Sequence, residues 1–213
     1  MRTRPAPPSN RGPASGTFGS VPAAPVFYFD YSSPYAYLAA MRIADVLPRA
    51  VWRPIAFGFV MRAVGKVPWS LRPGRESGMR DIEERAAERG LPPVRWPEGW
   101  PDRSYSLLPL RGAVVAERHG RLREFSFEVY RLMFAEGRTM TEPAPVLAAA
   151  EAAGLNRDAM AARLENPQIK AQLRSHTDEA IALGVTGVPT IAVGRALFWG
   201  DDQLEAAAAA AAA

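Results

Sequence analysis

Ser33 is the residue whose type and position best suit it to chemistry. It follows residues 26–30, which are aromatic or β-branched up to an acid and therefore predict a buried strand. Pro34 comes next, and the pair predicts a helix start, because a serine hydroxyl caps a free backbone N–H and a proline at the first helical position gives up a donor that has no partner. The hydroxyl is thus expected at the positive end of a helix dipole, beside the end of a strand. A purely structural N-cap is the alternative.

The composition is that of an ordinary globular protein and excludes several chemistries. With 213 residues, 48% of them hydrophobic, the chain can bury a core as one domain, or as one domain with an insertion. The 26 basic and 22 acidic residues are interspersed, which is typical of a solvated surface, so we expect no nucleic-acid partner. Cysteine is absent, so no disulfide, cysteine nucleophile or cysteine-based metal site is possible, and thiol chemistry would need a thiol supplied by a ligand.

The two ends of the chain are compositionally biased. Residues 1–25 are rich in proline, serine, glycine and alanine, and they predict a disordered tail without a signal peptide. Residues 206–213 are all alanine and form either a helical extension or a tail. The sequence has no run of about 18 apolar residues outside alanine-rich helices, so we expect no membrane span and a cytoplasmic protein.

The elements that would position the Ser33 hydroxyl follow a strand and helix order. Apolar residues at helical spacing follow Pro34, and a second strand is expected at 51–55. Residues 56–78, with several glycines and prolines, predict a loop, and 91–101 predict a rigid loop because four prolines remove backbone donors there. Helical periodicity fills the middle of the chain, with helices expected at 81–89, 106–119, 121–136, 143–153, 156–165 and 166–183.

Strand character returns near the C-terminus. Residues 187–194 are β-branched and bounded by glycines, and a tight turn at Gly194 and Arg195 leads into a second strand at 196–199. Residues 200–202 then begin a final helix. The order is β-α-β, a helical block and β-β-α, which predicts an α/β domain with a large helical insertion.

Three motifs at the two ends of this domain carry a family resemblance. They are FYFDYSSPYAYL at 27–38, GVPT at 187–190 and FWGDD at 198–202. Together they resemble 2-hydroxychromene-2-carboxylate isomerases, which are glutathione-dependent members of the DsbA-like, kappa-class glutathione transferase branch of the thioredoxin fold. The resemblance implies an α/β, thioredoxin-like domain over 26–205, with a large all-helical insertion at about 75–184 between its β-α-β and β-β-α halves.

In this resemblance Ser33 matches the catalytic serine. Redox relatives carry the first cysteine of a C-x-x-C motif there, whereas residues 33–36 contain no sulfur, so disulfide exchange by the protein itself is excluded. The family implies that the Ser33 hydroxyl donates to the sulfur of bound glutathione, while the helix dipole favours thiolate over thiol.

The other two motifs imply the glutathione-binding residues Val188, Trp199, Gly200, Asp201 and Asp202. The bond between Val188 and Pro189 matches the cis-proline element of the fold, where the Val188 backbone would pair with glutathione like an added strand. A trans proline at a strand start is the alternative. Asp201 and Asp202 would cap a helix or meet the ammonium group of glutathione, and the family often has asparagine at the first of them.

The substrate side departs from the resembled family. These isomerases meet the substrate carboxylate with a lysine after the second strand, and Met61 stands at that position. The nearby cations that could replace it are Arg62, Lys66, Arg72 and Arg75. Solvation at the surface is the alternative for each of them. Tyr105, Trp96 and Trp100 would either form an aromatic wall for a flat ring system or cover the helical block.

The resemblance implies a glutathione-dependent isomerase of an aromatic or bicyclic hydroxy acid, acting by reversible thiol addition, and a homodimer. The alternatives are a kappa-like glutathione transferase, which would release a stable conjugate, and a non-catalytic thioredoxin-like binding module. His119 and His176 lack a metal-ligand spacing, so we expect two surface residues and no metal site.

Overall fold

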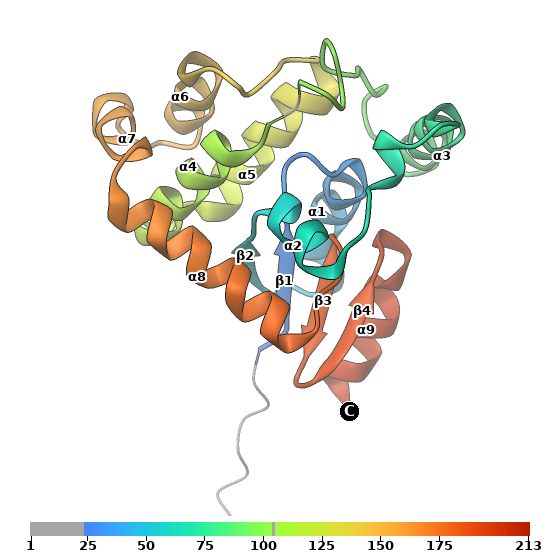
Figure 1. Cartoon of the computed structure of the whole chain (residues 1–213). Helices are drawn as coiled ribbons and strands as arrows, with labels where there is room; N and C mark the ends of the chain where they lie inside the picture. Colours follow the sequence, from blue (N-terminus) through green and yellow to red (C-terminus); the bar gives the residue numbers. More distant parts are fainter. Residues whose placement is uncertain (1–23, 104) are drawn as a thin grey trace, which may run out of the picture.

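In the computed structural model, four strands form one mixed sheet at the centre of the domain. Strand β1 (Val26–Phe29) pairs in parallel with β2 (Val51–Pro54) and antiparallel with β3 (Thr190–Val193). Strand β4 (Ala196–Trp199) pairs antiparallel with β3, which gives the order β2-β1-β3-β4. The first and last parts of the chain therefore share one sheet, as the blue and red ribbons of Figure 1 show.

Helices cover both faces of this sheet because successive β1 side chains are all apolar. Phe27 and Phe29 point to one face and Tyr28 to the other, and all three are buried. The helices on the Phe27 face are α1 (Pro34–Val46) and α9 (Leu204–Ala212), and those on the Tyr28 face are α2 (Phe57–Val64) and the C-terminal part of α8 (Pro167–Leu183).

The predicted helical block between the two halves of the sheet is confirmed. With α8, its helices are α3 (Arg75–Glu88), α4 (Leu107–Arg118), α5 (Leu122–Tyr130) with a π-helical turn at Arg131–Ala135, α6 (Pro143–Ala152) and α7 (Arg157–Leu164). The block shares a core with the sheet, since the ring centroid of Tyr130 lies 5.1 Å from that of Tyr31 and 6.4 Å from that of Phe29. The absence of helix and strand at 91–101 is also as predicted.

The loop predicted at 56–78 is wrong. The chain forms α2 there, then a 3-10 turn at Trp69–Leu71, and α3 begins at Arg75 rather than at Asp81. Two glycines in this stretch have structural roles inside or beside helices. Gly65 ends α2 with a φ of 64°, a conformation that favours glycine. Gly78 lies within α3, where a Cβ would come within 2.4 Å of the Trp69 ring.

The structure describes residues 24–103 and 105–213. The tail predicted at 1–25 therefore lies outside the described residues, apart from its last two positions. At the other end, the alanine run is the body of α9, and Ala207 is fully buried against the sheet. Of the two interpretations of the alanine run, the helical extension is the one that the structure has.

Candidate functional site

A pocket of about 770 Å³ opens where β1 ends and α1 begins. Its walls come from the start of α1, from α2 and the segment after it, from residues 100–101 and 105–107, and from the turns before β3 and after β4. It is lined by all the residues predicted to bind glutathione and by most of those predicted for the substrate, namely Ser33, Val188, Trp199, Gly200, Asp201, Asp202, Arg62, Lys66, Arg72 and Tyr105.

Ser33 caps α1, as predicted. Its backbone is extended, with φ −92° and ψ 114°, and its Oγ accepts a hydrogen bond from the N–H of Ala36 at 3.2 Å. The same hydroxyl donates to the carbonyl oxygen of Val188 at 3.3 Å. Ser33 is only 8% exposed, and it lines the pocket. The residue thus combines a structural cap with a hydroxyl in the pocket at the positive end of α1.

The peptide bond between Val188 and Pro189 is cis, as predicted from the motif. The Pro189 carbonyl accepts a hydrogen bond from the N–H of Gly200 at 3.0 Å, so the two C-terminal motifs are tied together. The indole of Trp199 lies against Gly187, where a Cβ would come within 2.5 Å of the ring. Only a residue without a side chain allows the ring to lie this close to the cis-proline turn.

The two adjacent acids of the last motif have different surroundings. Asp201 is 1% exposed, and its carboxylate forms ion pairs with Arg85 on α3 at 3.0 Å and with Arg89, just after the end of α3, at 2.6 Å. Asp202 is exposed and lines the pocket. Gly200, with a φ of 123°, makes the turn that separates them from β4. The Asp202 carboxylate is therefore accessible in the pocket, whereas Asp201 anchors α3 to the end of the sheet.

Arg85 also lines the pocket, although no sequence pattern singles it out. Besides Asp201, its guanidinium binds Asp81 at 3.0 Å, and it lies 5.6 Å from the ring centroid of Tyr35. The Tyr35 hydroxyl donates to Asp81 at 2.9 Å, and burial raises its pKa to about 12, so it stays protonated. This network joins α1, α3 and the final turn, and its longest link spans 116 residues, which is why sequence proximity gives no sign of it.

Three predicted cations stand at the pocket. Arg62 on α2, and Lys66 and Arg72 beyond it, line the pocket and are exposed, which fits contact with an anionic substrate and solvation at the surface equally. Met61 beside them is 8% exposed and lines the wall. The fourth candidate, Arg75, is the first residue of α3, and its guanidinium lies 3.7 Å from the carboxylate of Asp102. It does not line this pocket.

The aromatic wall differs in part from the one predicted. Trp100 and Tyr105 line the pocket, but Trp96 packs behind Trp100, with 4.4 Å between the ring centroids. The Trp96 N–H donates to Glu83 at 2.6 Å, so this ring serves the interface with α3. Trp69, which lies in the stretch predicted as a loop, takes its place in the wall, 5.7 Å from Trp100.

Comparison with known proteins places the chain in a family. Residues 26–212 match the model of the DSBA-like thioredoxin domain. The chain belongs to this family. It is 29% identical over 188 residues to 2-hydroxychromene-2-carboxylate isomerase of Sphingobium xenophagum, covering 84% of this chain and 93% of that protein. It is 26% identical over 208 residues to human glutathione S-transferase kappa 1, covering 88% and 90% of the two chains. The resemblance predicted from the three motifs is thus confirmed.

Solved structures of the DSBA-like family have the same fold. A 2-hydroxychromene-2-carboxylate isomerase aligns with a TM-score of 0.72 and 24% identity, over 84% of this chain and 90% of its own. The cytosolic disulfide reductase DsbM of Pseudomonas aeruginosa, solved with glutathione, aligns with a TM-score of 0.59 and 18% identity, over 88% and 95% of the two chains. The thioredoxin-like fold with a helical insertion is therefore confirmed.

Asp30 is a further pocket residue of this DSBA-like domain that sequence reasoning did not assign. It is 1% exposed and is the only acidic residue of the first motif. Its Oδ1 accepts hydrogen bonds from the N–H and hydroxyl of Ser32, at 2.8 and 2.9 Å, and its Oδ2 accepts from the N–H of Phe57 at 2.8 Å. Burial raises the pKa of Asp30, and these bonds together with one from the Ser106 hydroxyl oppose the rise.

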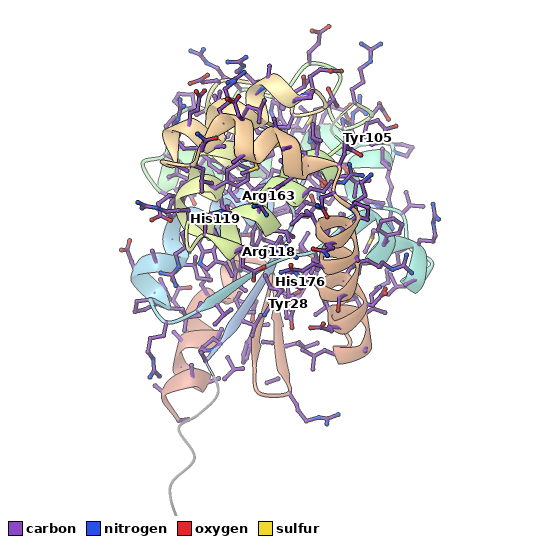
Figure 2. All side chains as sticks on the ribbon, turned by 90° about the vertical axis from the view of Figure 1, so that its left-hand side faces the viewer. Tyr28, Tyr105, Arg118, His119, Arg163 and His176 are labelled. Atoms are coloured by element: carbon purple, nitrogen blue, oxygen red, sulfur yellow. The ribbon has the colours of Figure 1, made fainter. Side chains whose placement is uncertain are left out.

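The prediction of two surface histidines is confirmed for His119 and wrong for His176. His119, at the end of α4, is exposed, whereas His176 on α8 is 5% exposed; Figure 2 labels both. The Nε2 of His176 lies 2.9 Å from the guanidinium of Arg53 and 3.7 Å from the carboxylate of Glu117. Burial and the charge of Arg53 lower the pKa of His176 to about 4, so the imidazole is neutral at neutral pH. The amphipathic pattern of α8 does not reveal these partners.

Over 24–103 and 105–213, no three histidine, aspartate or glutamate side chains are grouped as a metal ion would need. Within the same residues, every helix is too short or too polar to cross a bilayer.

Proposed function

We propose that this protein is a glutathione-dependent isomerase, similar to 2-hydroxychromene-2-carboxylate isomerase, that acts on an aromatic or bicyclic hydroxy acid by reversible thiol addition. One observation carries the proposal. The Ser33 hydroxyl lies in the pocket at the N-terminus of α1, 3.3 Å from the carbonyl that precedes the cis-proline, in a chain without cysteine. Redox relatives use a cysteine there, so this site would act on a thiol that a ligand brings.

Glutathione fits the groups that surround Ser33. A hydroxyl donor and the positive end of α1 would stabilise its thiolate, and the backbone of Val188 would pair with its peptide backbone. Asp202 would meet its ammonium group, because this carboxylate is exposed in the pocket while Asp201 is already held by two arginines. In this proposal Trp199 and Gly200 complete the glutathione site.

The chemistry follows from a thiolate in a largely apolar pocket. The sulfur would add to an electron-poor unsaturated carbon of the substrate, which turns a double bond into a single bond. Rotation or ring opening then becomes possible, and elimination restores the double bond and releases glutathione unchanged. Holding both reactants in one pocket supplies much of the rate.

The substrate would be anionic and flat. Arg62, Lys66 and Arg72 offer positive charge at one side of the pocket, and Tyr105 and Trp100 offer aromatic surface. Met61 stands at the position where the isomerases have a lysine, so one of the three cations would take over the contact that this lysine makes with the substrate carboxylate. We place the reaction in the cytoplasm, where glutathione is abundant, and expect a homodimer.

A kappa-like glutathione transferase is the second candidate, and the match to the human kappa enzyme favours it. It would use the same thiolate but would release a stable conjugate instead of eliminating the thiol. Mass spectrometry of the products separates the two, because an isomerase leaves the masses of substrate and glutathione unchanged.

The deciding experiment follows the ultraviolet spectrum of 2-hydroxychromene-2-carboxylate with the protein. We expect conversion with glutathione and none with S-methylglutathione, which fills the site but has no thiol. Conversion at the same rate without glutathione would refute the proposal. Calorimetry that detects no glutathione binding at millimolar concentration would favour a non-catalytic binding module.

A further inference from the structure

Asp30 is a buried acid for which the proposed function has no role yet. Its carboxylate lines the pocket, and its residue lies three positions before Ser33, whose N–H donates to the Asp30 carbonyl at 3.1 Å. Ser32 lies between them in the chain and also lines the pocket, and its hydroxyl donates to Asp30 Oδ1 at 2.9 Å. The pocket therefore holds a hydroxyl that is already bonded to the Asp30 carboxylate, next in sequence to the residue beside which the thiol is proposed to bind.

Three helix N-termini surround this carboxylate. Ser33 is the N-cap of α1, Phe57 is the first residue of α2, and Ser106 is the N-cap of α4. Each of these ends favours negative charge nearby. One negative charge in this part of the pocket is thus well stabilised by backbone dipoles.

No side-chain cation shares the site with Asp30. Among the described residues, no lysine or arginine lies within ion-pair distance of its carboxylate, and the cations of the pocket pair elsewhere or face solvent. The titratable groups that face it are Tyr31, and Tyr130 from α5, whose hydroxyl donates to the Asp30 carbonyl at 3.4 Å. Burial raises the pKa of both phenols, so both are neutral.

A second negative charge at this place would be unfavourable. Two anions that share a buried site without a cation cannot both ionise easily, and such a pair holds one proton between its members. When a glutathione thiolate forms beside Ser33, the buried Asp30 carboxylate of the same pocket is a group that can take up the released proton.

We propose that Asp30 holds the proton of the glutathione thiol while the thiolate is bound, an inference that rests on the proposed function. The S–H bond breaks as Ser32 takes the proton and passes its own to Asp30 Oδ1, so the net charge of the pocket does not change. When glutathione leaves as the thiol, the same path returns the proton. Asp30 acts through Ser32 and is therefore a positioning and proton-holding residue.

Proton counting tests this inference without any turnover. Glutathione is titrated into the full-length protein by calorimetry at about pH 7.5, below the ordinary thiol pKa of about 8.5, in buffers of different ionisation enthalpy, while thiolate absorbance near 240 nm is recorded. For the wild type we expect thiolate formation with essentially no proton released to the buffer. For Asp30→Asn we expect the same absorbance with about one proton released per glutathione bound.

Matched controls separate the possible results. Asp158→Asn removes an exposed carboxylate on α7 and should behave as the wild type does. S-methylglutathione, which has no thiol proton, should bind with neither absorbance nor proton release. If the wild type itself releases about one proton as the thiolate forms, Asp30 does not hold it and the inference is wrong, whether or not Asp30→Asn folds. Binding without thiolate absorbance would overturn it as well, whereas no binding at all would refute the proposed function instead.

Discussion

The floor of the pocket (Asp30, Ser33 and Val188) and its mouth (Phe59, Val67, Leu71, Tyr105, Leu107 and Trp199) are built from opposite kinds of residue. Floor residues are at most 8% exposed and are joined by hydrogen bonds to backbone groups of β1, α1 and the cis-proline turn. Mouth residues are large, apolar and at least 37% exposed. In the described part of the chain, Val51 is the only other large apolar side chain as exposed as these.

This difference separates what the fold determines from what a ligand would complete. The floor is rigid because its groups are held from both sides of the sheet, so it can present the same chemistry to every ligand. The apolar mouth is largely exposed in this chain, and contiguous apolar surface of this kind commonly marks a binding site. Chemistry and specificity would then reside in separate layers of one pocket, and the two layers should respond differently to substitution.

The largest effect is expected at the floor, from Ser33→Ala. Loss of a hydroxyl that stabilises a thiolate should lower turnover about 100-fold or more, as removal of one anion-stabilising donor does elsewhere. Loss of the cap should lower the free energy of unfolding by about 1 kcal/mol. Turnover and urea unfolding measure the two effects, and Ser175→Ala on the exposed side of α8 is the control. Unchanged turnover would remove Ser33 from the mechanism and leave it as a cap.

Low pH should destabilise the packing of helix α8 behind the pocket floor before it affects the apolar mouth of the pocket. Helix α8 holds the start of α2 through Thr177, which accepts the N–H of Ala56 at 3.0 Å, and His176 is its neighbour. His176 is neutral in the folded protein, with a pKa of about 4, but takes a proton below its ordinary pKa when unfolded. Stability should therefore fall as pH falls from about 6.5 to 4, by about 2 to 3 kcal/mol.

Paired variants test this pH dependence. The difference in urea stability between pH 7 and 4.5 should shrink in His176→Gln and stay as in the wild type in His119→Gln, because His119 is exposed. Equal differences in all three proteins would show that the buried imidazole does not control acid sensitivity.

The adjacent acids Asp201 and Asp202 allow a sharper test, because Asp201 is held in ion pairs within the fold whereas Asp202 is proposed to contact the ligand. Asp201→Asn leaves Arg85 and Arg89 without their buried counterion and should cost about 2 kcal/mol of stability, less than a fully buried pair because the arginines are partly exposed. Asp202→Asn should change stability by less than about 1 kcal/mol but weaken glutathione binding several-fold. Urea unfolding and calorimetry should show this crossed pattern; the reverse pattern would exchange the assignments.

The smallest effect is expected at the mouth. Arg62→Gln and Lys66→Gln should each raise KM for an anionic substrate about 3- to 10-fold, as exposed charge pairs do, and change stability by less than about 0.5 kcal/mol. Arg195→Gln, in the turn between β3 and β4, removes the same charge far from the pocket and should change neither quantity. An equal rise in KM for all three variants would mean that overall charge, and not local contact, attracts the substrate.

The same division explains how much could be predicted from the sequence. The cap at Ser33 and the helical block depend on local residue order, the cis bond before Pro189 is implied by the family resemblance of its motif, and these predictions are confirmed. Partners that meet across the fold were not predictable, such as Arg85 with Asp201 or Arg53 with His176, since each pair is more than 100 residues apart.

Helix α2 was missed for a different reason. Gly58 within it, and Gly65 and Pro68 after it, are typical of loops, and only tertiary packing makes this short apolar stretch helical. Trp69 was overlooked with it, because a ring in a loop gives no indication that it will pack on Gly78 and turn toward a pocket.

Ser33 stands where redox relatives carry a cysteine, and this difference should change how the protein responds to oxidative stress. A chain with no thiol cannot be trapped as a sulfenic acid or a mixed disulfide, which are the first products when peroxide meets a reactive cysteine. Peroxide would instead affect the activity through the ligand, because it converts free glutathione into glutathione disulfide, which has no thiol. The rate of such a protein would follow the redox state of the surrounding glutathione pool and would recover as that pool is reduced, without reduction of any cysteine in the protein.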